Sequence, residues 1–380
     1  MPVPPLAHDP ALTPVAVVFG GPSAEHDVSI VSGTAIADAL ADAGYPVSSW
    51  VIDLAGGWWW LPDGHRREGR PQAAYDDPGT LGATGPQHPG EALDSLASRE
   101  PRPVVFLALH GPFGEDGTVQ ALCEASGLAY TGSGVAASAI GMDKAIFKRL
   151  VRGLGLPVVD WVEVRASTWA KAPDTVLAEL AAFAGGTGDE RLMVKPARLG
   201  SSLGMTIAHV ADERAAALDE AFRFDDLVLV ERYLAGARDI EVAVIGNEPD
   251  SIELYGPGEI LSGHEFYDYV AKYTPGMSQS TLAAHVTPLQ RASLLKLARD
   301  VYRACGCEGF ARVDFLIAGD ALVISEINTI PGFTPISLFP TLPAAGGYDF
   351  GAVCSRVVDL ALERAAGRIV HRLTPADLPR

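Results

Sequence analysis

Four polar side chains near the C-terminal end of the chain have the types and spacing of a metal-binding face. Arg312 and Asp314 lie in ARVDFL, and Glu326 and Asn328 lie in ISEIN. If these are neighbouring strands joined by a three-residue turn at 318–320, Arg312 faces Glu326, and all four side chains share one face. Carboxylate and amide oxygens are the ligands that Mg²⁺ prefers, with waters and phosphate oxygens completing its shell. We therefore expect a magnesium site, the alternative being a solvated hairpin with a cross-strand Arg–Glu pair.

A glycine-rich loop that follows a lysine is a second candidate site, and its chemistry is phosphate binding. In MVKPARLGSSLGM, Lys195 ends an apolar strand-like run, and the next loop contains Ser201 and Ser202. Backbone N–H groups and hydroxyls in such a loop can cover phosphates while the lysine supplies a point charge. The segment is not a Walker A motif. Taken alone, it fits a glycine-rich hairpin beside a surface lysine equally well.

Three further polar residues stand at predicted junctions between strands and helices. Lys144 in GMDKAIFK begins a helix, where its charge opposes the helix dipole unless an anion binds there. Glu25 in GGPSAEHDVS and His110 in HGPFGEDG follow predicted strands, where a small ligand can meet the edge of a parallel sheet. Helix capping explains the segment around Glu25 equally well.

A weak match to a dinucleotide-binding fingerprint suggests a different chemistry. Residues 132–137, GSGVAA, fit G-x-G-x-x-A after the apolar run LAYTG. The match lies at the end of the first predicted unit rather than at its start. It also leaves the metal face, the Lys195 loop and Glu25 unexplained. A nicotinamide dehydrogenase therefore remains only a competing hypothesis.

The elements that must position these residues begin with a parallel α/β layer. Strand-like runs at 14–20, 47–54 and 103–109, with a helical pattern at 29–43, predict a doubly wound sheet in the first 140 residues. Ligand sites in such sheets lie beyond the C-terminal ends of the strands. The segment 61–102 is rich in proline, glycine and charge, so we expect a surface excursion without chemistry.

Two further units are expected after this layer. A helix that carries Lys144 opens the second unit, and strand-like runs between 227 and 255 predict a mostly antiparallel sheet in the third. A helix at 348–364 closes the chain. The expected boundaries are a flexible tail at 1–13 and domains at 14–142, 143–225 and 226–380.

The composition favours an enzyme without nucleic-acid or membrane partners. The formal net charge of −18 over 380 residues repels polyanions, and no apolar run approaches the roughly 20 residues of a membrane span. The N-terminus lacks the features of a signal peptide, so we expect a cytoplasmic protein. The four cysteines have no C-x-x-C spacing and are expected to be reduced thiols.

Seven segments resemble the D-alanine:D-alanine ligases, a family of ATP-grasp carboxylate–amine ligases, and they follow that family's order. They are GGPSAEHDVS, HGPFGEDGTVQ, YTGSG with GMDK, KPARLGSSLGM, FYDYVAKYTPG, ARVDF and EINTIPGFTPISLFP. The resemblance covers about residues 14–365. It implies an α/β ATP-grasp fold, in which an N-terminal doubly wound parallel domain precedes two α+β lobes that sandwich ATP.

The resemblance also implies a nucleotide and metal site. Asp314, Glu326 and Asn328 would bind Mg²⁺, with two ions and possible replacement by Mn²⁺. The implied contacts to ATP are Lys144, Lys195, Ser202 and Lys272 at the phosphates, Glu231, Leu234 and Phe266 at the adenine, and Asp239 or Glu241 at the ribose.

The amino-acid sites follow from the same resemblance. Segment 266–280 is similar to the family's mobile loop, which closes over the phosphates. The implied contacts are Glu25 with Ser201, Tyr273 and His110 at the first D-alanine, Arg312 and the N–H of Gly332 at developing negative charge, and Ser337 and Leu338 at the second D-alanine.

The implied reaction forms D-alanyl-D-alanine for peptidoglycan precursors. The first carboxylate attacks the γ-phosphate to give an acyl phosphate, and the second amine displaces phosphate. A ligase that uses D-lactate or D-serine as second substrate is the alternative; Tyr273, neutral at pH 7, favours the dipeptide over the ester because it does not repel an ammonium. A non-catalytic two-lobed amino-acid-binding protein is the remaining hypothesis. The family also implies a homodimer.

Overall fold

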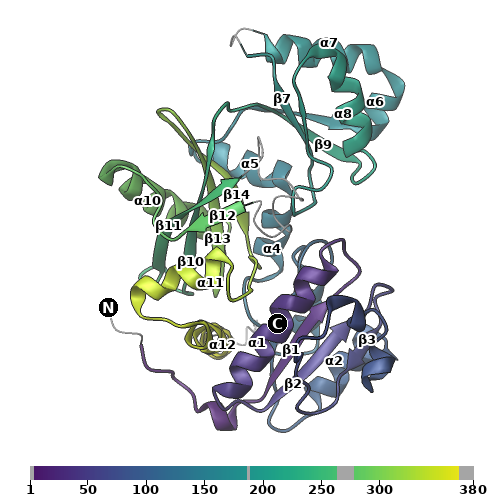
Figure 1. Cartoon of the computed structure of the whole chain (residues 1–380), viewed down its shortest axis with the longest axis vertical. Helices are drawn as coiled ribbons and strands as arrows, with labels where there is room; N and C mark the ends of the chain where they lie inside the picture. The colour runs from purple at the N-terminus through teal and green to yellow at the C-terminus, as the bar shows by residue number, and fades with distance from the viewer. Residues whose placement is uncertain (1–3, 186–188, 263–277, 368–380) are drawn as a thin grey trace, which may run out of the picture.

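The computed structural model describes residues 4–185, 189–262 and 278–367, and three β-sheets organise them (Figure 1). Phe266, Lys272 and Tyr273, for which the sequence predicts roles, lie outside the described residues.

The first sheet has the order β4-β3-β2-β1-β5 and confirms the parallel layer. Its parallel strands are β1 (Val15–Gly20), β2 (Val47–Ile52) and β5 (Val104–Leu107). Odd-numbered β1 residues pack with α1 (His26–Asp42) and α12 (Phe350–Gly367), whereas even-numbered ones pack with α2 (Pro89–Ala97) and α3 (Thr118–Ala125). Helices on both faces make the layer doubly wound.

The segment 61–102 is more than a surface excursion, which corrects the expectation from the sequence. It supplies β4 (Thr84–Gln87), which pairs with β3 (Trp58–Trp60), and it supplies α2. Leu93 and Leu96 of α2 are fully buried against the sheet. Their i, i+3 spacing is the apolar face of a short amphipathic helix.

The second sheet has the order β6-β9-β7-β8 and is antiparallel. It contains β6 (Trp161–Arg165), β7 (Leu192–Pro196), β8 (Thr206–Ala208) and β9 (Leu227–Arg232), and is packed by α6 (Ala166–Lys171), α7 (Pro173–Ala184) and α8 (Arg214–Ala221). The predicted boundary at 225 is therefore wrong, because β9 pairs with β6 and β7 and belongs to the central lobe.

The third sheet has the order β12-β11-β10-β13-β14 and is antiparallel. Its strands are β10 (Arg238–Ile245), β11 (Glu253–Ser262), β12 (Ser278–Thr281), β13 (Phe310–Ala318) and β14 (Ala321–Asn328). One face packs α10 (Pro288–Ala304), α4 (Val135–Met142) and α5 (Lys144–Gly153). Helix α5 packs on both lobes, because Phe147 and Val151 share this core while Ala145 packs with Leu227 and Leu229 of the second sheet.

The opposite face of the third sheet joins the first domain. It packs α11 (Leu338–Thr341) and α12, and α12 in turn lies beside α1, as Figure 1 shows. The C-terminal helix therefore connects two domains rather than closing only one.

The N-terminal segment is attached to this helix from Ala7 onward. The Ala7 N–H donates to Asp359 Oδ1 over 3.0 Å, and His8 lies 3.1 Å from the same oxygen through Nδ1. His8 Nε2 is 2.8 Å from the Tyr45 hydroxyl. A wholly flexible tail at 1–13 is therefore incorrect for its second half.

Removing residues 1–9 should lower the free energy of unfolding by about 1–3 kcal/mol, because hydrogen bonds to a charged group are lost from a half-buried site. Turnover should be unchanged, since no described residue of the tail lines the cleft described below. Urea unfolding curves measure the first effect, and a matched deletion of residues 1–6 retains Ala7 and His8. Equal stability of the two truncations would contradict a role for these contacts.

Candidate active site

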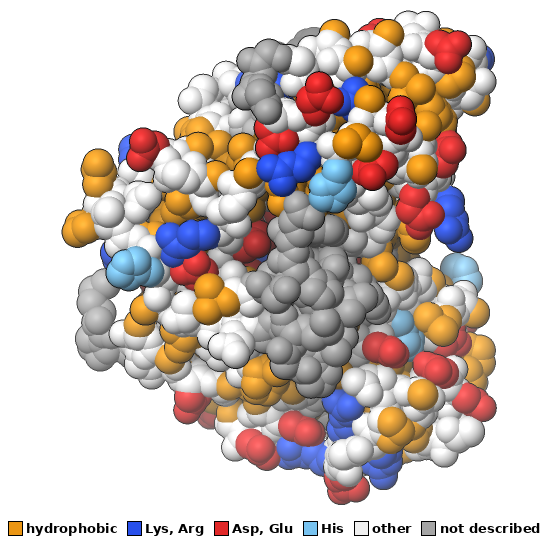
Figure 2. All heavy atoms as spheres, turned by 45° about the horizontal axis from the view of Figure 1, so that its top comes forward, with side chains coloured by type: hydrophobic (Ala, Val, Ile, Leu, Met, Phe, Trp, Pro, Cys, Tyr) orange, Lys and Arg blue, Asp and Glu red, His pale blue; other side chains and the backbone are white. Residues whose placement is uncertain are grey.

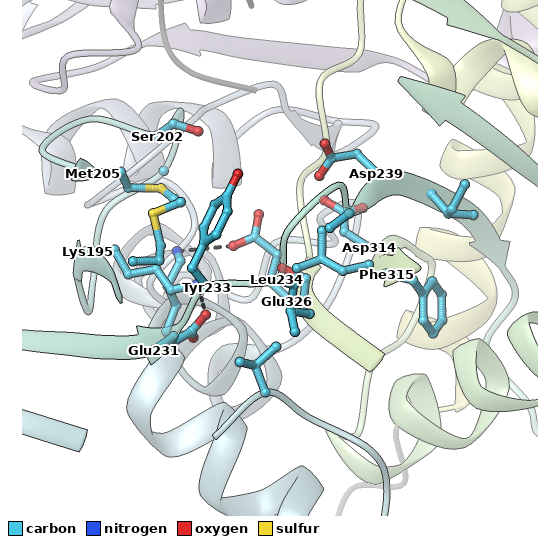
Figure 3. Close-up of a pocket in the computed structure, with 18 of the residues that line it drawn as sticks. Lys195, Ser202, Met205, Glu231, Tyr233, Leu234, Asp239, Asp314, Phe315 and Glu326 are labelled. Carbon is cyan, nitrogen blue, oxygen red and sulfur yellow. Dashed lines mark ion pairs between the residues drawn. The ribbon is translucent and has the colours of Figure 1, made fainter. Parts of the chain in front are cut away.

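A cleft lies between the second and third sheets and collects most of the predicted site residues (Figure 3). Figure 3 shows Lys195, Ser202 and Glu231 on one side and Asp239 and Asp314 on the other. The predicted residues that line it are Lys144, Lys195, Ser201, Ser202, Glu231, Leu234, Asp239, Glu241, Arg312, Asp314 and Glu326. These residues come from α5, the two sheets and the loops after β7 and β9.

The metal face has the predicted side chains but a different register. Arg312 pairs with Asn328, not with Glu326, and Asp314 pairs with Glu326. The turn is shorter than expected, because Ala318 already pairs with Ala321, and a bulge interrupts the ladder after Asp314. Without the bulge, Arg312 and Asp314 would point to one face of the sheet and the polar residues of β14 to the other. Each shift of the pairing by one residue moves a side chain to the opposite face.

Asp314 is the centre of a hydrogen-bonded group on this face. Arg312 donates to both its carboxylate oxygens, from Nε and Nη2, over 2.7 Å each, and Asn328 Nδ2 donates to Oδ2 over 2.9 Å. Burial opposes the charge of Arg312, but Asp314, Glu241 and Glu326 raise its pKa well above the usual value. Arg312 is therefore a permanent cation in the cleft.

The donor set fits Mg²⁺. Asp314 and Glu326 offer carboxylate oxygens, and Asn328 offers an amide oxygen beside the nitrogen that it uses for Asp314. Among the described residues there is no group of three His, Cys, Asp or Glu side chains that could hold a metal ion. A partial set of hard oxygen ligands is typical of Mg²⁺ sites that rely on phosphate oxygens and water.

Lys144 reaches from the first residue of α5 into the cleft. Its Nζ donates to the carbonyl of Leu199 over 2.9 Å and lies 3.2 Å from Glu326 Oε2. Burial alone would lower the pKa of Lys144, but the carboxylates of Glu326, Glu115 and Glu25 raise it overall. The ammonium is thus held between the glycine-rich loop after β7 and the metal face.

Glu25 is a buried carboxylate with one unsatisfied oxygen. Ser201 Oγ donates to Oε1, while Oε2 has no hydrogen-bond partner among the described residues. A Cβ built on Gly111 or Gly200 would lie 2.8 or 2.7 Å from Oε2, so the backbone closes tightly around it. Glu25 does not cap α1 with its side chain, which argues against the capping interpretation. A buried, unpaired carboxylate oxygen suits a ligand ammonium.

The loop that carries Ser201 has an unusual backbone. Ser201 and Ser202 have φ of 51° and 57°, in the left-handed region that non-glycine residues seldom occupy. This conformation places Ser201 on Glu25 of the first domain and leaves Ser202 in the cleft wall. Strained backbone of this kind often accompanies ligand binding.

His110 is buried beside Glu25, as predicted. Its Nε2 is 3.1 Å from the Ser32 hydroxyl, and Ser23 donates to its backbone carbonyl over 2.8 Å. Burial lowers the pKa of His110 although the charge of Glu25 raises it. A neutral imidazole is therefore favoured at neutral pH.

Glu115 is a titratable residue that sequence reasoning missed. It follows His110 in HGPFGEDG, and its carboxylate accepts the Gly111 N–H over 2.7 Å. Burial and the charge of Glu25 raise its pKa to about 8 from 4.5. The acidic pair in that motif was a visible signal, but its proximity to Glu25 depends on the fold.

The free energy of unfolding should fall as the pH rises from about 4.5 to about 8, because the native protein loses the proton of Glu115 at a higher pH than the unfolded chain does. A raised carboxyl pKa means that the native protein binds this proton more tightly than the unfolded chain, so stability is lost as the proton leaves. The free energy of unfolding of Glu115→Gln, minus that of the parent, should rise with pH by up to about 1.4 kcal/mol per unit. Urea unfolding from pH 5 to 8 measures this, with exposed Asp94→Asn as control. A difference independent of pH would contradict it.

Ser337 and Leu338, predicted at the second amino acid, and Gly332, predicted at developing negative charge, are not among the residues that line the cleft. Ser337 Oγ is 2.7 Å from Thr334 Oγ1, and a Cβ on Gly332 would lie 3.4 Å from Ser337 Oγ. Leu338 begins α11 and is buried in the core. The structure thus places Gly332 and Ser337 together after β14, but does not bring them among the residues that line the cleft.

The segment 132–137 is an interdomain joint, which overturns the dinucleotide interpretation. Gly132 has φ of 82°, and a Cβ there would contact Phe310. Arg364 donates to the carbonyls of Gly132 and, over 2.7 Å, of Tyr130. The glycines allow close packing between the first domain and the third sheet, and no described residue of this segment lines the cleft.

The surface outside the cleft carries charges of both signs. Figure 2 shows acidic and basic side chains interspersed on one face, in a chain of net charge −18. No helix in the described ranges is long and apolar enough to span a membrane, and all four cysteines are buried and unpaired.

The sheets and the cleft between them define an ATP-grasp protein, and comparisons with known proteins agree. The chain belongs to the D-alanine–D-alanine ligase family: the family descriptions "D-ala D-ala ligase N-terminus" and "D-ala D-ala ligase C-terminus" match residues 14–133 and 150–359.

Relatives and solved structures extend over nearly the whole chain. D-alanine--D-alanine ligases of Heliobacterium modesticaldum and Kineococcus radiotolerans are each 40% identical, over 92% and 93% of this chain and 94% and 97% of theirs. The VanG D-Ala:D-Ser ligase of Enterococcus faecalis superposes with TM-score 0.77 at 29% identity, covering 92% of this chain and 99% of that one. The D-alanine-D-alanine ligase of Coxiella burnetii gives TM-score 0.72 at 28% identity, covering 94% and 95%.

Proposed function

We propose that this protein joins two D-alanine molecules with ATP, forming D-alanyl-D-alanine, ADP and phosphate for peptidoglycan synthesis. The single observation that carries the proposal is the unsatisfied oxygen of buried Glu25, next to the Ser201–Ser202 loop and the cleft that Lys144 and Lys195 line. An amino acid whose ammonium binds Glu25 can direct its carboxylate toward phosphates held in that cleft. Family membership supports the same reaction.

Each cleft residue has a chemical task in this reaction. Lys144 and Lys195 neutralise the phosphates, which lets a carboxylate approach the γ-phosphate and form an acyl phosphate. Arg312 stabilises the negative charge that develops when the second amine attacks. Asp314, Glu326 and Asn328 would hold Mg²⁺, which would supply Lewis-acid polarisation of the phosphate oxygens when bound. We expect two ions, replaceable by Mn²⁺.

Asp239 is the better candidate for the ribose. Glu241 lies 3.4 Å from Arg312 and is buried, so its charge already serves the interior of the cleft. Asp239 lies on the cleft wall, and Figure 3 shows its carboxylate toward the open space. Leu234 and the apolar lining residues Val159, Met193 and Leu316 would enclose the adenine.

D-serine is the second candidate for the second substrate, because the VanG structure belongs to a D-Ala:D-Ser ligase. We propose D-alanine as the preferred one. The test incubates the protein with ATP and equimolar D-alanine, D-serine and D-lactate at pH 7 and identifies the products by mass. Predominant D-alanyl-D-alanine is expected, whereas predominant mixed dipeptide or ester would overturn the substrate assignment.

We also propose a cytoplasmic homodimer, as the family resemblance implies. Light scattering of the purified protein measures the mass in solution. A mass near that of a single 39.9 kDa chain at micromolar concentration would contradict the dimer.

A further inference from the structure

Lys148 is a buried lysine directly behind the cleft. It lies on α5, one turn after Lys144, and is 1% exposed. Its Nζ is 2.6 Å from Glu231 Oε1 and 5.2 Å from the centre of the Trp161 ring. Lys148 does not line the cleft, whereas its ion-pair partner Glu231 does, so Lys148 can act on a ligand through Glu231.

Glu231 is shared between two ammonium groups. Its other oxygen, Oε2, lies 2.7 Å from Lys195 Nζ, and the residue is 3% exposed. Burial raises the pKa of Glu231, but Lys148 and Lys195 together lower it below the usual value. A carboxylate so deeply buried stays charged only while a cation accompanies it.

Binding of a nucleotide would remove one of these two partners. Lys195 lines the cleft beside Ser202, so the phosphates of ATP would attract it away from Glu231. Lys148 would remain, since it does not line the cleft. Glu231 would then keep one ion pair and stay fixed in the cleft wall.

We propose that Lys148 is a positioning residue for nucleotide recognition, which holds Glu231 as an anion when Lys195 turns to the phosphates. The proposal rests on the use of ATP in the proposed function. A fixed carboxylate accepts a hydrogen bond from the 6-amino group of adenine and repels the carbonyl of a 6-oxo purine. Lys148 thereby strengthens binding of ATP and contributes to discrimination against inosine triphosphate.

The test measures binding of Mg-ATP and Mg-inosine triphosphate by calorimetry, without D-alanine, to Lys148→Met, Glu231→Gln and the double variant. Without Lys148, Lys195 either stays with Glu231 and is lost to the phosphates, or turns to the phosphates and leaves Glu231 without a cation. Lys148→Met should therefore weaken ATP binding by at least about 10-fold. The loss for inosine triphosphate should be smaller. The KM for D-alanine should change by less than about threefold, since Lys148 touches neither amino-acid site.

The double variant decides whether Lys148 acts through Glu231. An uncharged amide needs no cation, so Lys148→Met should add no further loss to Glu231→Gln. This comparison stays valid if Lys148→Met alone fails to fold, because the double variant lacks both buried charges. A further tenfold loss in the double variant, or equal losses for both nucleotides in Lys148→Met, would overturn the proposal.

Arg152→Met is the matched control. Arg152 also lies on α5 and over Trp161, with Cζ 4.0 Å from the ring centre, but its ion pair is with Asp160 at 2.6 Å. Its removal should leave nucleotide binding unchanged. Turnover of the parent protein with ATP and D-alanine tests the proposed function separately. If the parent is active and Lys148→Met leaves nucleotide binding unchanged, only this inference is refuted.

Discussion

Replacing Glu326 with glutamine should reduce kcat at least about 100-fold while the protein remains folded. The variant loses a charged oxygen ligand from the metal face and the partner of Lys144, 3.2 Å away. Both losses affect the phosphate end of the cleft, where charge neutralisation makes the first step possible. Glu326 is only partly buried, so packing of the core is unaffected.

Steady-state kinetics across a Mg²⁺ titration measure this effect. The variant should need a higher Mg²⁺ concentration, and saturation with Mg²⁺ should restore only part of the activity. Asp320→Asn is the matched control, because it removes an exposed carboxylate from the turn of the same hairpin. Near-normal turnover by Glu326→Gln at low Mg²⁺ would show that the metal face is misassigned.

Replacing Glu25 with glutamine should lower kcat/KM for D-alanine by about 100- to 1,000-fold, because the buried partner of the substrate ammonium loses its charge. Stability should respond differently. Glu25 Oε2 lacks a hydrogen-bond partner among the described residues, so the neutral amide relieves a desolvated charge. The free energy of unfolding should therefore stay constant or rise.

Loss of activity without loss of stability separates a substrate-binding role from a structural one. Initial rates at varied D-alanine and urea unfolding curves give the two quantities. Asp27→Asn is the control, since Asp27 is an exposed carboxylate in the first turn of the same helix. A variant with normal kcat/KM, or one that loses activity only because it unfolds, would remove Glu25 from the site.

The sequence predicted features that depend on local pattern. The parallel layer followed from apolar runs of strand length, and the alternation of β1 between two helical faces agrees with that prediction. The common face of Arg312, Asp314, Glu326 and Asn328 was also predicted, although its register was wrong. A shorter turn and a bulge each shift the pairing by one residue, and neither has a strong local signal.

Features that depend on contacts between distant segments were missed. The strand at Leu227–Arg232 was assigned to the third unit, yet it pairs with strands of the central lobe. Glu115 and Lys148 received no role, because their environments depend on Glu25 and Glu231, which are remote in the chain. Strand partners and buried ion pairs are tertiary properties that a single sequence does not display.

Transfer of oxygen from D-alanine to phosphate is the most direct test of an ATP-dependent ligase that works through an acyl phosphate. D-alanine labelled with ¹⁸O in its carboxylate is incubated with ATP and Mg²⁺, and the released phosphate is analysed by mass. Attack of the carboxylate on the γ-phosphate followed by displacement by the second amine predicts phosphate with one labelled oxygen, together with D-alanyl-D-alanine. Unlabelled phosphate, or dipeptide formed without phosphate release, would contradict this account.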